Sequence, residues 1–126
     1  MSARFIPQSV HGVLDYAVAL VLIVAPFVFG FRVESELAHW LSVAAGVGLV
    51  GYSLLTDYSM SAKALIPIRL HLVLDFAAGA LFVMVPFLAG FKGVAMPFYV
   101  VMGAAVIAVV LATDPSPRRA SARAHA

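Results

Sequence analysis

The sequence contains an internal repeat, which constrains the fold more than any other feature. Residues 6–31 recur sixty positions later as residues 66–91. Both copies begin with Ile-Pro and place a His and an Asp four residues apart in a long apolar run. The segments that follow also correspond, because each ends in Thr-Asp, at an offset of 57 residues. A repeat of this kind indicates that one structural unit is present twice.

The apolar runs are long enough to cross a bilayer. Of the 126 residues, 63% are hydrophobic and 11% are charged, whereas soluble domains contain about 25% charged residues. The mean hydropathy is +1.05. A hydrocarbon core of about 30 Å requires about 20 apolar residues at about 1.5 Å per residue. The sequence therefore predicts four membrane spans, at about residues 7–30, 37–55, 67–90 and 94–112.

Two spans in each repeat predict an all-α bundle of four transmembrane helices, built as two tandem helical hairpins. Because each copy then enters the membrane from the same side, the repeats should be related by a pseudo-twofold axis along the membrane normal. We expect one membrane domain, residues 1–114, with repeats at about 6–59 and 66–116. Residues 115–126, rich in Pro, Ser, Ala and Arg, are expected to form a disordered basic tail.

The cations predict the orientation of these spans. Only Arg32 and Lys92 belong to the two loops on one side of the membrane. The other six share the opposite side: Arg4, Lys63, Arg69, Arg118, Arg119 and Arg123. By the positive-inside rule this side is cytoplasmic, so we expect a multi-pass protein of the inner (plasma) membrane with both termini in the cytoplasm. The pI of about 9.3 therefore reflects topology, and nucleic acid is not an expected partner.

Polar side chains should gather at the cytoplasmic ends of the helices. His and Asp at positions i and i+4 share one face of a helix, and an Asp inside the hydrocarbon is a functional hypothesis by default. The candidate cluster consists of His11, Asp15, His71, Asp75, Asp57 and Asp114.

Three interpretations of this cluster remain open. In the first, each Asp pairs with its own His or with Thr56, Thr113 or Ser53 and holds the repeats together, while Asp57 and Asp114 are turn residues. In the second, His11, Asp15, His71 and Asp75 bind a divalent metal such as Zn, Mn or Fe, or the two His bind a haem. In the third, Asp15 and Asp75 carry protons or cations across the membrane.

Small residues and prolines predict where the helices meet. Ser42 and Gly46, like Ala44 and Gly48, are four residues apart, and Ala104, Ala108 and Ala112 continue this spacing in the last span. Such faces allow close helix approach. Pro26, inside the first span, should weaken the backbone bond to the Leu22 carbonyl.

The ends of the first and third spans carry a family resemblance. Residues 26–31, Pro-Phe-Val-Phe-Gly-Phe, and residues 86–91, Pro-Phe-Leu-Ala-Gly-Phe, resemble the SPW-repeat integral membrane proteins of bacteria. The chain has Ala-Pro-Phe and Val-Pro-Phe where Ser-Pro-Trp is typical of that family. The resemblance implies a small integral membrane protein, and no functional residue can be carried over from it.

The function expected from the sequence is that of a small membrane protein without evident enzymatic machinery. The chain contains no Cys, which excludes thiol nucleophiles and thiolate metal sites, and no nucleophile elbow is present. We expect a structural or accessory subunit or a small binding module. The alternative is a metal-, haem- or proton-binding protein that uses the His/Asp cluster, with ion or small-solute transport as a further role. The expected partners are the lipid bilayer and a second copy or another membrane protein.

Overall fold

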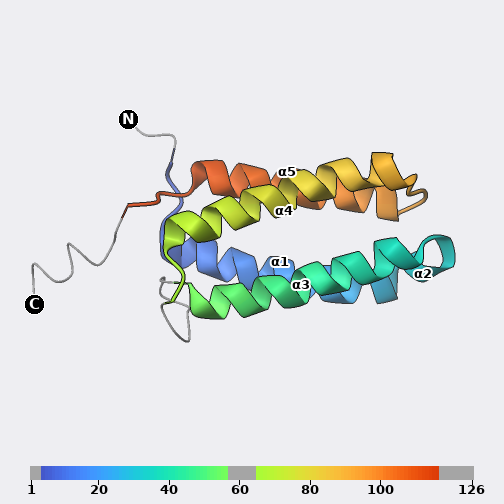
Figure 1. The fold of residues 1–126 in the computed structure, drawn as a ribbon, viewed down its shortest axis with the longest axis horizontal. Helices are drawn as coiled ribbons and strands as arrows, with labels where there is room; N and C mark the ends of the chain where they lie inside the picture. The colour runs from blue at the N-terminus through green and yellow to red at the C-terminus, as the bar shows by residue number, and fades with distance from the viewer. Residues whose placement is uncertain (1–3, 57–64, 117–126) are drawn as a thin grey trace, which may run out of the picture.

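The computed structural model describes residues 4–56 and 65–116 of the chain. Within these residues the fold is all-α, and Figure 1 shows two hairpins of long helices, α1 with α3 and α4 with α5. The helices are α1 Gln8–Val28, α2 Phe31–Glu34, α3 Glu36–Leu55, α4 Ile68–Ala89 and α5 Ala95–Ala112. The four long helices have the length and composition to cross a membrane, and they agree with the four predicted spans.

The short helix α2 lies between the first two predicted spans. Gly30 precedes it in the left-handed region, at φ 66°. This conformation commonly ends helices, and glycine adopts it readily because it lacks a Cβ. Gly90 ends α4 in the same way, at φ 70°. Ser35 then starts α3, because its side chain accepts a hydrogen bond from the Ala38 N–H at 3.0 Å, a common N-cap.

The segment that begins each repeat pairs with the segment that ends the other repeat. Ile6, just before α1, forms a parallel bridge with Thr113, just after α5, and Ile66 forms the equivalent bridge with Thr56. The start of each repeat is therefore paired with the end of the other. This symmetrical pairing is the pseudo-twofold arrangement that the sequence predicts. It brings the chain before α1 and the chain after α5 to one end of the bundle (Figure 1), which we call the polar end.

Each hairpin is closed by glycines. A Cβ added to Gly46 would lie 2.7 Å from Ile23 Cγ1 and 2.8 Å from the Ala19 carbonyl oxygen, so α1 and α3 pack closely there. A Cβ on Gly79 would lie 2.9 Å from the Gly103 carbonyl oxygen, so α4 and α5 pack closely there.

The small residues predicted to mediate helix contacts are only partly those that do. Gly46 is such a contact, but an added Cβ on Gly48 would meet nothing within 4 Å. In α5 the stripe is also displaced, since Ala104 and Ala108 are exposed while Gly103 is buried. The prediction was wrong for these positions within the chain. For α5 the reason is that the helix is apolar on all sides, so its sequence does not indicate which face packs.

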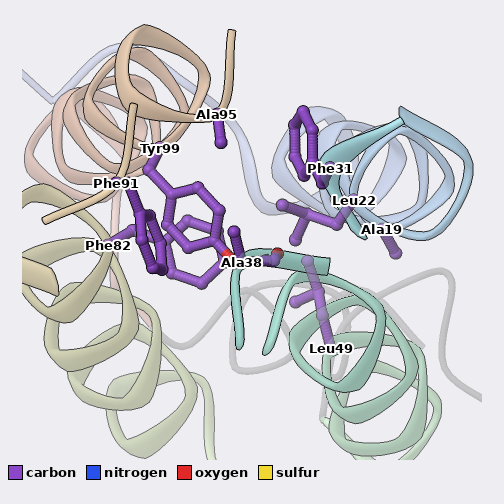
Figure 2. Close-up of a cluster of buried hydrophobic side chains, with 9 residues drawn as sticks. All are labelled: Ala19, Leu22, Phe31, Ala38, Leu49, Phe82, Phe91, Ala95 and Tyr99. Carbon is purple, nitrogen blue, oxygen red and sulfur yellow. Dashed lines mark hydrogen bonds between the residues drawn. The ribbon is translucent and has the colours of Figure 1, made fainter. Parts of the chain in front are cut away.

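An aromatic cluster joins the hairpins at the end opposite to the polar end. Figure 2 shows the Tyr99 ring beside Phe82 and Phe91, with its hydroxyl directed toward Ala38 of the other hairpin. The Tyr99 hydroxyl donates a hydrogen bond of 2.5 Å to the Ala38 carbonyl, and the Tyr99 and Phe82 rings stack at 4.4 Å. The ring centroids of Phe31 and Phe98, which belong to different hairpins, lie 5.1 Å apart.

Helix α1 continues through Pro26, and a neighbouring helix compensates for the missing backbone bond. Proline has no N–H, so the Leu22 carbonyl lacks its usual helical donor. Ser42 of α3 donates its hydroxyl to that carbonyl at 2.7 Å. The predicted defect at Leu22 is thereby repaired by a contact between helices.

Candidate functional site

Four polar side chains meet in the centre of the polar end. His11 and Asp15 lie in the first turns of α1, and His71 and Asp75 lie in the first turns of α4. Their spacing of four residues directs each pair to one face of its helix, and both faces point into the bundle. The two His are fully buried, and the Asp side chains are 8% and 3% exposed. We call these four residues the His/Asp ring.

The ring alternates between the two repeats. His11 Nε2 lies 3.2 Å from Asp15 Oδ1 in its own helix and 3.0 Å from Asp75 Oδ2 in the other. His71 Nε2 lies 3.2 Å from Asp75 Oδ2 and 2.7 Å from Asp15 Oδ2. Each imidazole therefore contacts both carboxylates, and one ligand atom from each residue lies within 4.8 Å of the others. The contacts across the repeats are shorter than those within them.

A threonine from the opposite repeat holds each imidazole by its second nitrogen. Thr113 Oγ1 is 2.8 Å from His11 Nδ1 and donates its proton to the Val109 carbonyl at 2.6 Å. Thr56 Oγ1 is 2.7 Å from His71 Nδ1 and donates to the Tyr52 carbonyl at 2.6 Å. A hydroxyl has one proton, so each Thr oxygen accepts a hydrogen bond from Nδ1–H.

This arrangement determines what the two Nε2 atoms can do. With Nδ1 protonated, a neutral imidazole presents a lone pair at Nε2. Two such lone pairs and two carboxylates at these distances would repel one another in a medium that screens charge poorly. The centre of the ring therefore requires positive charge, either as protons on both Nε2 atoms or as a metal cation between the four residues.

Tyr52 breaks the symmetry of the site. Its hydroxyl donates a hydrogen bond to Asp75 Oδ1, and its ring lies 4.7 Å from the His71 ring. The equivalent position in the second repeat is Val109, which has no donor to offer Asp15. Sequence reasoning missed Tyr52. The signal that could have revealed it is the tyrosine in one repeat aligned with a valine in the other.

The other two acidic candidates are not part of the ring. Asp57 lies outside the described residues. Asp114 is exposed, and its Oδ1 accepts the Ser116 N–H at 2.9 Å, as expected for a turn residue. Hydrogen bonds from the Ser116 side chain and from its backbone N–H hold the pKa of the Asp114 carboxyl below its usual range.

A cavity of about 360 Å³ leads from the ring into the middle of the bundle. Residues of α1, α3, α4 and α5 line it, and Asp15, Asp75 and Tyr52 are among them. The remaining walls are apolar, and Gly48 contributes to them. The hairpins are thus joined by the ring at one end and by the Tyr99 cluster at the other, with open space between.

A family profile, described as the SPW repeat domain, matches residues 9–113. The chain belongs to the SPW repeat family. The SPW repeat match includes both hairpins and all four residues of the His/Asp ring, and with the four apolar helices it identifies a small multi-pass membrane protein. No curated protein and no solved structure is significantly similar to the chain.

Proposed function

We propose that this SPW repeat protein is a small binding module that holds a divalent transition-metal cation in the His/Asp ring. The observation that carries this proposal is the threonine contact on each Nδ1, which leaves both Nε2 lone pairs directed at the carboxylates. Metal-binding His residues commonly donate their other N–H to an oxygen that fixes the ring. The arrangement supports a role in binding and requires no catalytic step.

The charges of the ring favour a divalent ion. Two neutral imidazoles and two carboxylates carry two negative charges, which a divalent cation cancels. The ring lies inside helices that can cross a membrane, where an uncompensated charge is costly. The donor set of two imidazoles and two carboxylates is suited to Zn²⁺, Mn²⁺ or Fe²⁺.

The dimensions of the ring are close to those that such an ion needs. Ligands at about 2.0–2.2 Å from a tetrahedral Zn²⁺ lie about 3.3 Å from one another. The four His–Asp distances are 3.2, 3.0, 2.7 and 3.2 Å. Binding would therefore widen the ring by a few tenths of an ångström. A haem held by both His fits poorly, because the Asp carboxylates occupy the space between the Nε2 atoms.

Protons are the second candidate for the centre of the ring. The separation of 2.7 Å between His71 Nε2 and Asp15 Oδ2 is that of a direct charge-assisted hydrogen bond. Two imidazolium ions with two carboxylates are also neutral, so one divalent cation can replace two protons without a net change in charge. In this candidate the ring joins the repeats, or it moves protons.

Metal analysis of the protein purified in detergent without chelator separates the two candidates. We expect one divalent ion per chain by mass spectrometry of the metals. Asp15→Asn and His71→Ala should lose this ion while circular dichroism and gel filtration remain those of the parent. Asp114→Asn is the matched control, because it removes an exposed carboxylate outside the ring and should keep the ion.

Two results would overturn the metal proposal. One is a parent protein that retains no ion after dialysis against Zn²⁺, Mn²⁺ and Fe²⁺. The other is equal metal content in Asp15→Asn and Asp114→Asn. If the parent retains no ion, proton flux in liposomes, measured for the parent and for Asp15→Asn, tests whether the ring moves protons.

The same helices support a proposal for the location of the protein. We propose that the protein resides in the inner (plasma) membrane with the polar end and both termini in the cytoplasm. Arg4 precedes α1 and Arg69 is in the first turn of α4, both at the polar end, whereas Arg32 in α2 and Lys92 between α4 and α5 lie at the other end. This distribution supports the proposed orientation. A second copy or another membrane protein is the partner expected for the exposed faces of the helices.

A further inference from the structure

A second hollow, separate from the central cavity, lies on the outside of the second hairpin at the polar end. Its volume is about 420 Å³, and residues of α4 and α5 form its walls together with Arg4 and Pro115 from the terminal segments. None of the four residues of the His/Asp ring lines it. We call this hollow the basic groove because two arginines, Arg4 and Arg69, stand at its polar edge.

The two arginines are placed for an anion. Arg69 is exposed at the second position of α4, and it forms no ion pair with any residue in the described ranges 4–56 and 65–116. Arg4 Nη1 donates to the Thr113 carbonyl at 2.9 Å, which holds Arg4 against the end of α5. A guanidinium has five N–H donors and binds phosphate in a bidentate manner. Asp114 is an acidic group near Arg4, and with two arginines the described edge carries a net positive charge.

The rest of the groove is apolar and lies deeper in the membrane. Phe76 is seven residues after Arg69, roughly 10 Å further along the helix axis. Val73 and Phe76 are 62% and 45% exposed, whereas Leu72 and Val110 are buried behind them. In a membrane these exposed side chains contact hydrocarbon. The groove therefore has cations at the level of the headgroups and apolar walls at the level of the acyl chains.

In the sequence, the two arginines are not repeated at the equivalent positions of the other copy. With the offset of sixty residues, Ser9 occupies the place of Arg69 and Ala64 occupies the place of Arg4. The cations are therefore not part of what the repeat needs in order to fold. Within the described residues, the two arginines stand together at the edge of this groove, which supports a binding site there.

We propose that the basic groove binds an anionic phospholipid, with its phosphate on Arg4 and Arg69 and one acyl chain along Val73 and Phe76. Basic pockets between transmembrane helices bind the headgroups of such lipids. A lipid in this position contacts the N-terminal segment, α4 and the segment after α5 together. It would thus clamp the terminal segments whose bridge places Thr113 beside His11. This proposal does not depend on a metal in the His/Asp ring.

The test is a lipid titration of the purified protein in detergent. Short-chain phosphatidylglycerol, short-chain phosphatidylcholine and inorganic phosphate are each added, and the apparent Kd is read from the shift in Tm. We expect phosphatidylglycerol to raise the Tm well above the effect of the other two. Arg69→Gln should weaken its apparent Kd roughly fivefold, the share of one cation near a membrane surface, and Arg4→Gln should act similarly.

Lys92→Gln is the matched control, because it removes an exposed cation at the opposite end of the bundle. It should leave the apparent Kd unchanged, whereas an equal loss in Lys92→Gln and Arg69→Gln would overturn the proposal. Equal shifts with phosphatidylcholine would also overturn it, as would a full effect of inorganic phosphate alone. If a variant is too unstable to titrate, native mass spectra give the number of phosphatidylglycerol molecules retained by Arg69→Lys and by Lys92→Gln. We expect Lys92→Gln to retain as many of these lipid molecules as the parent.

Discussion

His71 and Asp15 belong to different repeats, and their side chains are 2.7 Å apart. The carboxylate of His71's own helix, that of Asp75, is more distant at 3.2 Å. The i,i+4 spacing therefore positions the two side chains of each pair, but the closest contact of His71 in the ring crosses the pseudo-twofold axis.

The threonines behind the imidazoles provide a sharp test of the metal proposal. Replacing Thr113 by Val keeps the shape of the side chain but removes the oxygen that accepts from His11 Nδ1. Loss of such an outer contact typically weakens metal binding by about 10- to 100-fold. We expect that range for Thr113→Val and for Thr56→Val, measured by competition with a chromophoric chelator. Thr113→Ser keeps the hydroxyl and is the control, so equal affinities of the Val and Ser variants would contradict the prediction.

Metal binding should depend steeply on pH. The ring is neutral with either one divalent cation or two protons, so binding at acidic pH must displace two protons. We expect affinity to fall as the pH is lowered, with log Kd changing by up to about two per pH unit. Isothermal titration in buffers of different ionisation enthalpy counts the released protons directly. Binding that is independent of pH would show that the ion lies elsewhere.

The serines of α3 should differ in their effect on stability. Ser42→Ala removes the donor to the Leu22 carbonyl, which Pro26 leaves without a helical partner. An unsatisfied buried acceptor costs about 1–3 kcal/mol, and we expect a loss at the lower end of that range. Ser53→Ala is the control, because the Ser53 hydroxyl is buried and has no hydrogen-bond partner among the described residues. It should be neutral or slightly stabilising, as measured by reversible unfolding in mixed micelles.

The glycines that close the hairpins should tolerate no larger side chain. Gly79→Leu and Gly46→Leu would force the helices apart, and overpacking of this kind typically costs about 1–3 kcal/mol or more. Gly48→Leu directs its side chain into open space beside the cavity and should retain nearly the stability of the parent. If all three variants melt together, the close approaches do not limit stability.

Reporter fusions test the orientation in the membrane. A reporter that is active only in the periplasm should be inactive after Ala126 and active when inserted between Arg32 and Glu36. The reverse pattern would place the polar end outside the cytoplasm and contradict the reading of the cations.

Much of the fold was predictable because hydropathy and repetition are local signals. The run lengths gave the four spans to within two residues, and the matched His-Asp pairs indicated which faces point inward. The alternation of the ring could not be predicted, because i,i+4 spacing brings His11 to Asp15 but says nothing about Asp75. The contacts of Thr56 and Thr113 were expected with the carboxylates and are made with the imidazoles. Gly79 and Gly103 were missed because the face on which two apolar helices pack is decided by shape, which hydropathy does not record.

The alternation of the ring also has an evolutionary consequence. A single hairpin contains one His, one Asp and one Thr of the site, and its Thr reaches only the His of the other hairpin. An ancestral chain with one hairpin would therefore have completed the ring only as a homodimer with a true twofold axis. Duplication and fusion of such a hairpin would make that dimer one molecule and would allow its two halves to differ in sequence. Tyr52 opposite Val109 and Arg69 opposite Ser9 are positions where the two halves differ.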